Sequence, residues 1–285
     1  MNDELKFTVI SDIHYYSKKN FVDGFDKNKK PKPGQLFFSR SEEIVEHTFD
    51  CLCKNDTPDI VLISGDLTYN GERTSHDEMK AALKKLQQNG KRVYVITATH
   101  DYTTPRMPTY GIDKNDKYIE VESVKRTQLL KYYGDFGYNN AIAKHKSTMS
   151  YVAQLADGYR LFALNDDYGD PDCGFSDELM NWVKTEANNA KRDGQYIIAM
   201  THHPLVPPSP IYTAVAKGDM LNEYELRRKQ LSDLGFDFVL TGHTHMHNIS
   251  YCKIGNKKFY DISTAALTGF PPYYRQIVLN KEQKK

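Results

Sequence analysis

The sequence predicts an α/β protein in which layers of helices cover mostly parallel strands. Two observations support this fold class: apolar runs rich in β-branched and aromatic residues alternate with helix-period segments, and those runs are apolar almost throughout. Strands with no polar face are typical of parallel sheets that are buried on both sides. A chain of 285 residues is long enough to bury such a core.

Six segments read as buried strands, each followed by polar residues or glycine. They are residues 7–11, 60–64, 93–97, 161–164, 196–200 and 238–240. We also expect residues 249–279 to form short strands and turns that extend or pair with a second sheet.

Four amphipathic segments read as helices between these strands. The first covers residues 41–54, and the second begins at Ser75 with a capping box to Glu78 and ends at Asn89-Gly90. The third begins at Ser176 and ends near residue 194. The fourth covers residues 222–234 and is closed by a glycine.

Two polar stretches interrupt the alternation. Residues 15–40 read as a long loop with a solvated lysine run at 27–32, and residues 105–146 read as an insertion over the rim of the sheet, with a helical patch near 121–133. We expect a single domain over residues 1–285.

Composition excludes several classes of function. With 38 basic and 37 acidic residues the net charge is +1, which gives no sign of a nucleic-acid-binding surface. No apolar run approaches the roughly 18 residues of a membrane span. Because no signal-peptide core follows the N-terminus, a cytoplasmic location is favoured, with a removed leader in a longer precursor as the alternative. The four cysteines are too few for a disulfide framework.

Metal-ligand residues follow five of the six predicted strands. The motifs are Asp12-Ile13-His14, Gly65-Asp66, Thr99-His100-Asp101, His202-His203-Pro204 and Gly242-His243-Thr244-His245. Carboxyl ends of strands are where open α/β sheets bind ligands. Each motif alone has an ordinary structural explanation, such as a turn aspartate or a surface histidine. Five in one chain predict two metal ions side by side, a device for phosphate-ester hydrolysis.

The spacing within the motifs suggests individual roles. Asp-x-His and His-x-His each place two ligands on one side of an extended chain. Adjacent histidines point opposite ways, so only one of His202 and His203 is expected to be a ligand. His247 continues the alternation and is a further ligand or, preferably, a neighbour.

The His100-Asp101 pair suggests an imidazole whose tautomer or charge is set by a carboxylate, suited to a phosphate contact or to general-acid catalysis. An ordinary surface ion pair explains this segment equally well. Tyr15, Tyr16 and Tyr102 flank the site and could stack on a base or close the pocket. Packing of the loops is slightly favoured for them.

The order and type of these motifs resemble the calcineurin-like metallophosphoesterase superfamily. The pattern runs from Asp12 to His245, and the stretch from Ser64 to His76 resembles the branch that contains bacterial cyclic-nucleotide phosphodiesterases. This resemblance implies a four-layer α/β/β/α sandwich of two mixed sheets flanked by helices. It also implies a phosphodiesterase that uses a metal-bound hydroxide for in-line attack on phosphorus.

The resemblance further implies which residues hold each metal. Asp12, His14, Asp66 and His245 would hold the first metal. Asp66 as the bridge, the residue at position 99, His202 and His243 would hold the second. His100 would stabilise the phosphoryl group or protonate the departing oxygen, with Asp101 orienting it. Carboxylate and imidazole ligands fit Mn, Fe or Zn without choosing among them.

Position 99 departs from the family pattern, which has Asn where this chain has Thr99 and Gly where it has Ala98. An amide oxygen reaches one bond further than a hydroxyl and is a better neutral ligand for a hard cation. We therefore expect weaker binding of the second metal, with turnover reduced or more dependent on added metal.

Three functions remain open on this basis. The first is a phosphodiesterase for a small phosphoester, with a cyclic nucleotide among the candidate substrates. The second is a phosphomonoesterase with the same metals, and the third is a scaffold that keeps the fold and binds a partner. Thr99 is the only support for the scaffold, and retention of His100 and of every carboxylate and histidine ligand argues against it.

Overall fold

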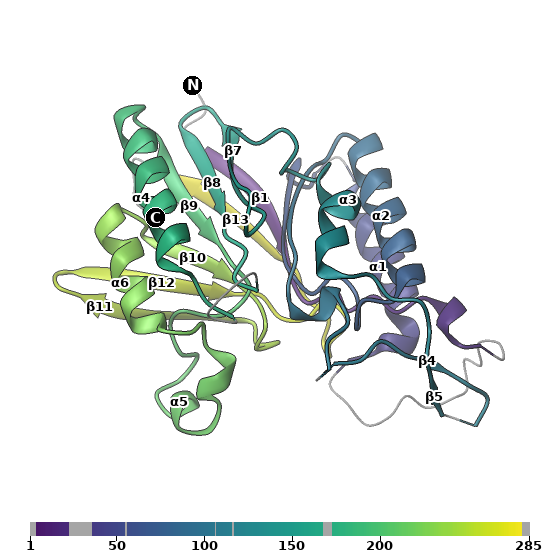
Figure 1. The fold of residues 1–285 in the computed structure, drawn as a ribbon. Helices are drawn as coiled ribbons and strands as arrows, with labels where there is room; N and C mark the ends of the chain where they lie inside the picture. Colours follow the sequence, from purple (N-terminus) through teal and green to yellow (C-terminus); the bar gives the residue numbers. More distant parts are fainter. Residues whose placement is uncertain are drawn as a thin grey trace.

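The computed structural model describes residues 4–22, 36–54, 56–105, 107–115, 117–167 and 173–280. Two β-sheets face each other, and helices cover the outer side of each (Figure 1). This arrangement confirms the predicted four-layer α/β/β/α sandwich. The predicted lysine run at 27–32 lies outside the described residues. No helix in the described ranges is long and apolar enough to cross a membrane.

The first sheet has four strands. Its order is β13 (Arg275–Asn280), β1 (Glu4–Ile10), β2 (Ile60–Ser64) and β3 (Arg92–Ile96). The last three are parallel, and β13 pairs antiparallel with β1. The carboxyl ends of β1, β2 and β3 therefore lie at one edge.

The second sheet has seven strands. Its order is β11 (Asn248–Ile254), β12 (Lys257–Ser263), β10 (Phe238–Thr241), β9 (Tyr196–Met200), β8 (Tyr159–Ala163), β7 (Ser150–Ala156) and β6 (Ala143–His145). Strands β12, β10, β9 and β8 are parallel, and antiparallel strands extend both sides. The sequence predicted three of these strands and the strand-rich tail, but missed β6 and β7.

Helices α1 (Ser41–Leu52), α2 (Arg73–Gln88) and α3 (Leu129–Tyr133) cover the first sheet. Helices α4 (Asp177–Arg192) and α6 (Tyr224–Leu234) cover the second. The short α5 (Tyr212–Val215) lies in the connection after β9, and β4 (Gly111–Ile112) and β5 (Tyr118–Ile119) form a separate hairpin (Figure 1).

Side chains of each central strand alternate between two cores, as period-2 geometry requires. In β2, Val61 and Ile63 pack beneath α1 and α2, whereas Ile60 and Leu62 pack between the sheets. In β8, Leu161 faces the other sheet, and the next residue along faces α4. This double burial explains why the strands read as continuous apolar runs.

Two helix ends follow ordinary capping chemistry, whereas α1, α2 and α6 begin without a side-chain cap. Ser176 caps α4 by accepting the N–H of Leu179, and Gly235 closes α6 with φ 100°. The predicted start of α2 is wrong, because this helix begins at Arg73. Ser75 lies inside it, and its Oγ accepts the N–H of Ser17 from the first long loop.

Candidate metal centre

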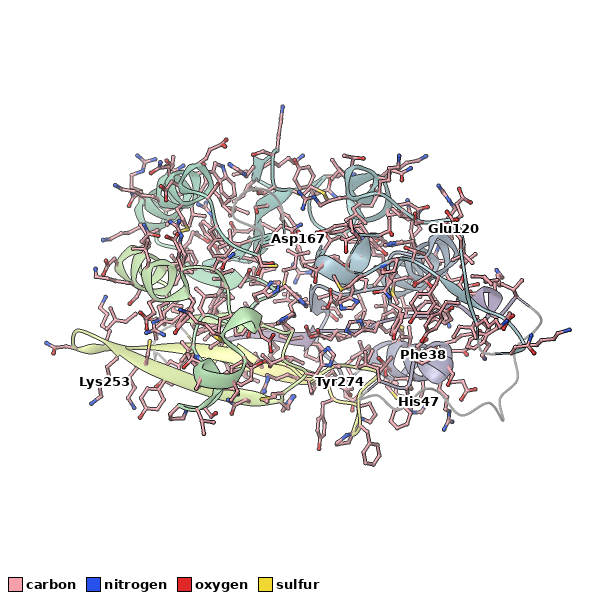
Figure 2. The ribbon with its side chains drawn as sticks, turned by 60° about the horizontal axis from the view of Figure 1, so that its bottom comes forward. Phe38, His47, Glu120, Asp167, Lys253 and Tyr274 are labelled. Atoms are coloured by element: carbon pink, nitrogen blue, oxygen red, sulfur yellow. The ribbon has the colours of Figure 1, made fainter. Side chains whose placement is uncertain are left out.

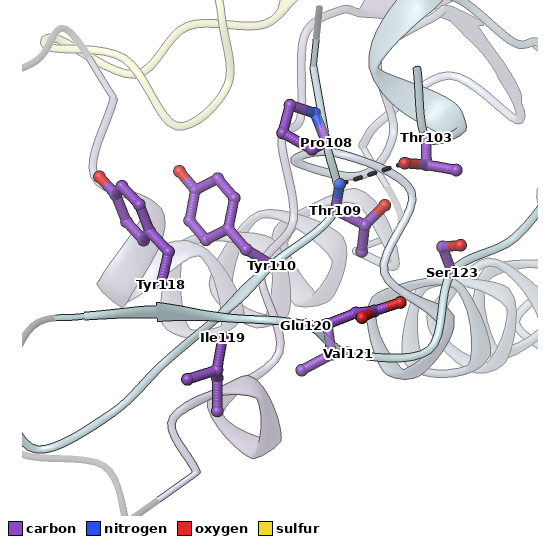
Figure 3. A pocket seen from close by; sticks show the side chains of 9 residues that line it. All are labelled: Thr103, Pro108, Thr109, Tyr110, Tyr118, Ile119, Glu120, Val121 and Ser123. Carbon is purple, nitrogen blue, oxygen red and sulfur yellow. Dashed lines mark hydrogen bonds between the residues drawn. The ribbon is translucent and has the colours of Figure 1, made fainter. Parts of the chain in front are cut away.

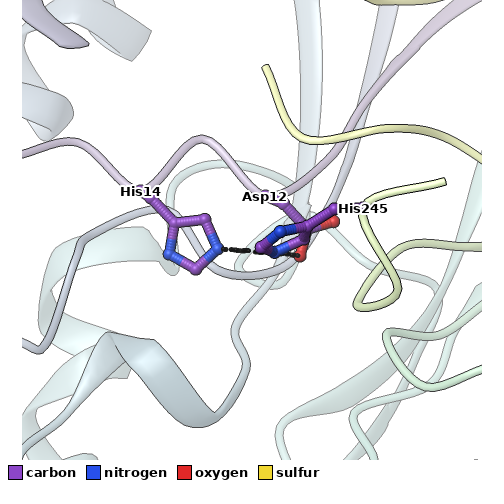
Figure 4. Close-up of side chains that lie close together, drawn as sticks. All are labelled: Asp12, His14 and His245. Carbon is purple, nitrogen blue, oxygen red and sulfur yellow. Dashed lines mark hydrogen bonds and ion pairs between the residues drawn. The ribbon is translucent and has the colours of Figure 1, made fainter. Parts of the chain in front are cut away.

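Three of the predicted ligands meet where the loops after β1 and β10 converge. Asp12 and His14 follow β1, and His245 follows β10. The Nε2 atoms of His14 and His245 are 3.2 Å apart, and Asp12 Oδ1 lies 3.4 Å from His245 Nε2 (Figure 4). These residues form one group that could hold a metal ion.

A second such group consists of Asp66, His202 and His243. Asp66 Oδ2 lies 3.2 Å from His202 Nε2, and it is also 3.7 Å from His14 Nε2 in the first group. Asp66 therefore lies between the two groups. A third group overlaps both, because His14 and Asp66 also lie close to His100.

The backbone at these ligands is strained. Asp12, His14, Asp66, His243 and His245 all have left-handed backbone, with φ between 45° and 64°. Such angles are uncommon for residues other than glycine and cost on the order of 1–3 kcal/mol each. Strain of this kind persists only where the surrounding structure fixes it, and it is concentrated at functional sites.

Two glycines allow the ligand turns to approach each other. A Cβ at Gly65, where φ is 103°, would lie 2.8 Å from His202 Nδ1. A Cβ at Gly242 would collide with the side chains of Ser11 and Asp12. Each glycine in these motifs therefore makes room for a ligand from a different strand.

Asp101 fixes the turn that carries Asp66. Its Oδ1 accepts the N–H groups of Leu67 at 2.8 Å and Thr68 at 2.9 Å, and its Oδ2 accepts that of Ala98 at 2.9 Å. Both carboxylate oxygens are thus bound to backbone. This arrangement differs from the prediction, in which Asp101 orients the ring of His100.

The ring of His100 is oriented by other residues. Its Nδ1 lies 2.6 Å from the carbonyl oxygen of Tyr69 and 2.9 Å from Asn70 Oδ1. The backbone N–H of His100 donates to Asp66 Oδ1 at 3.0 Å. Because Nδ1 is engaged, Nε2 is the ring nitrogen left for a substrate.

Two further buried aspartates, which sequence reasoning missed, hold the ligand loops of the second sheet. Asp166 Oδ2 accepts the N–H groups of His202 at 3.2 Å and His203 at 2.7 Å. Asp261 Oδ2 accepts those of Leu205 at 2.7 Å and Val206 at 3.0 Å. Asp166 also follows a predicted strand, so the strand-end signal was available for it.

The charges of this cluster shift the pKa values of its members in both directions, because Asp66 raises the pKa of His202 and Asp12 raises the pKa of His245. Burial alone would raise the pKa of Asp66, but the imidazoles of His202 and His100 hold that pKa well below its usual range. Burial lowers the pKa of His14 to about 3, and burial with the charge of His203 lowers the pKa of His243. Metal ligands must be ionised carboxylates or neutral imidazoles, so a metal ion must displace the proton from any imidazole that these carboxylates keep charged.

The residues present fit a metal centre. His202 Nε2 is buried and, within the described ranges, has no hydrogen-bond partner, although it lies close to Asp66. A buried nitrogen without a partner is costly unless another group, such as a metal ion, satisfies it. The donor set of oxygen and nitrogen atoms suits Mn, Fe or Zn.

Thr99 begins a short 3-10 helix, Thr99–Asp101, at the end of β3. It directly precedes His100, whose N–H is bound to Asp66, so position 99 lies beside the second group. The family's glycine is not needed at Ala98, because its φ of −145° is open to any residue.

The structure does not bring the predicted tyrosines to the ligands. Tyr15 is buried in the core beneath α2, and its hydroxyl donates to Glu78 at 2.9 Å. Tyr102 is in the same core, with the guanidinium of Arg126 5.4 Å from its ring. Tyr16 is also buried. Packing, the alternative that the sequence slightly favoured, describes all three.

His203 and His247 are neighbours of the ligands. The ring of His203 lies 4.1 Å from that of His243, and its Nδ1 is 3.2 Å from Asp166 Oδ1. His247 packs on Tyr273 with ring centroids 5.0 Å apart. Neither belongs to the groups that could hold a metal among the described residues.

A cavity of about 570 Å³ lies beside the loop that carries His100 (Figure 3). Thr109 in its wall bonds to the carbonyl oxygen of Asn70, the residue that holds His100. Tyr110 and Tyr118 also line this cavity, with ring centroids 4.1 Å apart. The segment predicted as an insertion thus supplies a wall near the candidate site.

One solved structure that is similar to this chain supports the fold. The chain is similar to a dimetal phosphatase from Danio rerio, with TM-score 0.65, 11% identity, and coverage of 97% of this chain and 93% of that one. It is less similar to a phosphopantetheinyl hydrolase from Mycobacterium tuberculosis, with TM-score 0.46, 12% identity and 97% of each chain covered.

A comparison with curated proteins gave no match. A sequence model of the calcineurin-like phosphoesterases, in contrast, matches residues 5–247. That range is most of the chain and includes every predicted ligand from Asp12 to His245. The chain therefore belongs to the calcineurin-like phosphoesterase family.

Proposed function

We propose that this protein is a dinuclear metal-dependent phosphoesterase that acts preferentially on small phosphodiesters. The observation that carries the proposal is the position of Asp66. One of its carboxylate oxygens lies within 4 Å of imidazoles from both ligand groups, as a bridge between two cations requires.

In this proposal Asp12, His14, Asp66 and His245 hold the first metal. Asp66, His202 and His243 hold the second, with Thr99 as a weak ligand beside them. Manganese, iron and zinc all suit these donors. When bound, two metals activate water and bind the phosphoryl oxygens.

His100 and the residues that hold the ligand turns would contribute the remaining catalytic functions. Tyr69 and Asn70 fix Nδ1 of His100, which directs its other nitrogen to the phosphoryl group or the departing oxygen. Asp101 acts as a positioning residue, because its carboxylate holds the turn of Asp66. Preorganised donors of this kind cost no rearrangement during the reaction.

The test is hydrolysis by metal-stripped protein titrated with Mn²⁺. The substrates are bis-p-nitrophenyl phosphate, a diester, and p-nitrophenyl phosphate, a monoester. We expect metal-dependent turnover with the diester faster, and at least a 1,000-fold loss in Asp66→Ala, on the order of removing an essential catalytic group.

Asp193→Ala is the control, because Asp193 is an exposed carboxylate that pairs with Arg160. Faster cleavage of the monoester would replace the diesterase proposal with phosphomonoesterase. No turnover of either substrate at saturating Mn²⁺ would overturn the enzyme proposal and favour a scaffold.

A further inference from the structure

Three exposed aromatic side chains lie on segments that contact the segments of the candidate metal ligands. We call Phe37, Phe270 and Tyr273 the aromatic rim. Phe270 is 82% exposed, and its ring centroid lies 6.0 Å from that of Phe37, edge to face. Tyr273 is also exposed and packs on His247. Exposed aromatic rings that lie near one another can form a binding surface.

Backbone hydrogen bonds tie this rim to a metal-ligand turn. The N–H of Leu267 donates to the carbonyl oxygen of Asp12 at 3.1 Å, and the N–H of Phe37 donates to that of Thr268 at 2.8 Å. Phe270 follows Leu267 by three residues, a span of at most about 11 Å. The backbone of Phe270 therefore lies at most about 11 Å from the residue that bonds to the Asp12 turn.

Tyr273, the other side of the rim, contacts the segment that follows His245. His247 follows the predicted ligand His245 by two residues, and its ring contacts Tyr273. Figure 2 shows that this part of the chain, marked by Tyr274, lies on the same face as Phe38. The rim thus joins two segments that border the metal centre, one before α1 and one after β12.

The chemistry of the two parts differs. The metal centre is polar and suits a phosphoryl group, whereas the rim offers the faces and edges of three rings. Aromatic rings bind planar bases by stacking, and this contact tolerates different bases because each has a π-face. Aliphatic chains gain less from such directed ring geometry.

We propose that the aromatic rim binds a planar ring carried by the ester arm of the substrate, so that the substrate class is nucleotide-like phosphoesters. This inference rests on the proposed phosphoesterase function. It assigns substrate specificity to residues that are not metal ligands and that the sequence did not single out.

The experiment measures binding of two phosphonate analogues, those of AMP and of ribose 5-phosphate, to protein loaded with Mn²⁺. The analogues differ only in the planar base, and neither can be hydrolysed. We expect calorimetry to give the AMP analogue the lower Kd, by about 5- to 100-fold, as base–aromatic stacking predicts. In Phe270→Ala this ratio should fall towards 1, while the Kd of the ribose analogue stays unchanged.

Tyr251→Ala is the matched control, because Tyr251 is an exposed aromatic residue on β11, the strand that reaches away from the site (Figure 1). It should keep the wild-type ratio. Equal Kd values for the two analogues in the wild type would overturn the inference even if bis-p-nitrophenyl phosphate is hydrolysed.

If bis-p-nitrophenyl phosphate is not hydrolysed but the AMP analogue still has the lower Kd, the proposed phosphoesterase function is overturned and the inference about the rim is not. Flotation with phosphatidylcholine vesicles distinguishes a different occupant. Vesicle binding that is lost in Phe270→Ala, combined with equal Kd values, would make the rim a lipid contact and contradict a nucleotide-like substrate.

Discussion

The ligand turns and the aromatic rim border the same site but are held in different ways. Asp12, Asp66 and His202 are buried, and carboxylates or backbone groups of neighbouring strands fix the turns that carry them. Phe270 lies three residues after Leu267, whose N–H donates to the carbonyl oxygen of Asp12, and its side chain is 82% exposed. The ligand turns are thus fixed by several hydrogen bonds each, whereas the aromatic rim is open to solvent.

This difference separates two requirements of a phosphoesterase. Two metals and a nucleophile need positions fixed to fractions of an ångström, because small displacements cost large factors in rate. Recognition of a planar group needs aromatic contact area and tolerates small movements of the contacting side chains. The buried aspartates should therefore control metal binding and stability, and the rim should control the choice of substrate.

The largest expected effect concerns Asp261, which holds the segment after His203. Burial raises the pKa of Asp261 to about 6, against 3.8 for an ordinary aspartate. Since the folded pKa is the higher one, the contribution of this group to stability is fully present below about pH 4. It is lost as the pH rises through 6.

Relative to Asp261→Asn, the wild-type free energy of unfolding should thus fall by about 3 kcal/mol between pH 4 and 8. Urea unfolding of metal-stripped protein across this range measures the difference. A difference that does not vary with pH would show that the hydrogen bonds from Leu205 and Val206 outweigh burial and keep the carboxylate ionised.

A second effect concerns metal affinity and Asp166. Oδ2 of Asp166 accepts the N–H groups of both His202 and His203, and in Asp166→Asn a neutral amide oxygen, which is a weaker acceptor than a carboxylate oxygen, would replace it. We expect Asp166→Asn to weaken Mn²⁺ binding by about 10- to 100-fold, the usual cost of losing a group that orients a ligand. Calorimetric titration with Mn²⁺ measures it.

Asp193→Asn again provides an exposed control. The circular dichroism spectrum of Asp166→Asn should match the wild type, which separates positioning from loss of fold. An unchanged Mn²⁺ affinity would contradict the idea that the buried aspartates control metal binding, because the hydrogen bonds from Asp166 to the His202 segment would then not affect the metal.

The same contrast explains what the sequence could predict. Candidate ligands such as His14 and Asp66 follow apolar strands, and parallel strands bring those ends to one edge, so periodicity and spacing predicted that these residues would lie close together. The hydrogen bonds of Asp166 and Asp261 depend on which strands become neighbours, which one sequence does not reveal. Local patterns were also misleading where tertiary contacts took over, as at Ser75, which binds a distant loop.

The rim and the tyrosines show this limit most clearly. Tyr15 is next to a ligand in the chain, yet its side chain points into the core and bonds to Glu78. Phe37 and Phe270 are far from each other in the chain, yet their rings meet. Proximity in sequence is therefore a poor guide to which aromatic residues border a site.

The smallest expected effect, and the one of opposite sign, concerns Thr99. The turn there is already fixed, because the N–H of His100 is bound to Asp66 and that of Ala98 to Asp101. Thr99→Asn therefore adds an amide oxygen one bond further from a backbone that need not move. We expect Mn²⁺ to bind the second site about tenfold more tightly, with the first site unchanged.

Titration of the two sites by calorimetry measures this gain, and Thr99→Ala shows what the hydroxyl contributes. If Thr99→Asn binds no more tightly than the wild type, water already completes the second site and the side chain at 99 is not a ligand. If Mn²⁺ binds both sites more tightly, the turn that carries residue 99 has moved. The turns that carry the ligands are then less rigid than their hydrogen bonds indicate. Tighter Mn²⁺ binding at the second site alone would show that the ligand turns are rigid enough for one added ligand atom to determine metal affinity.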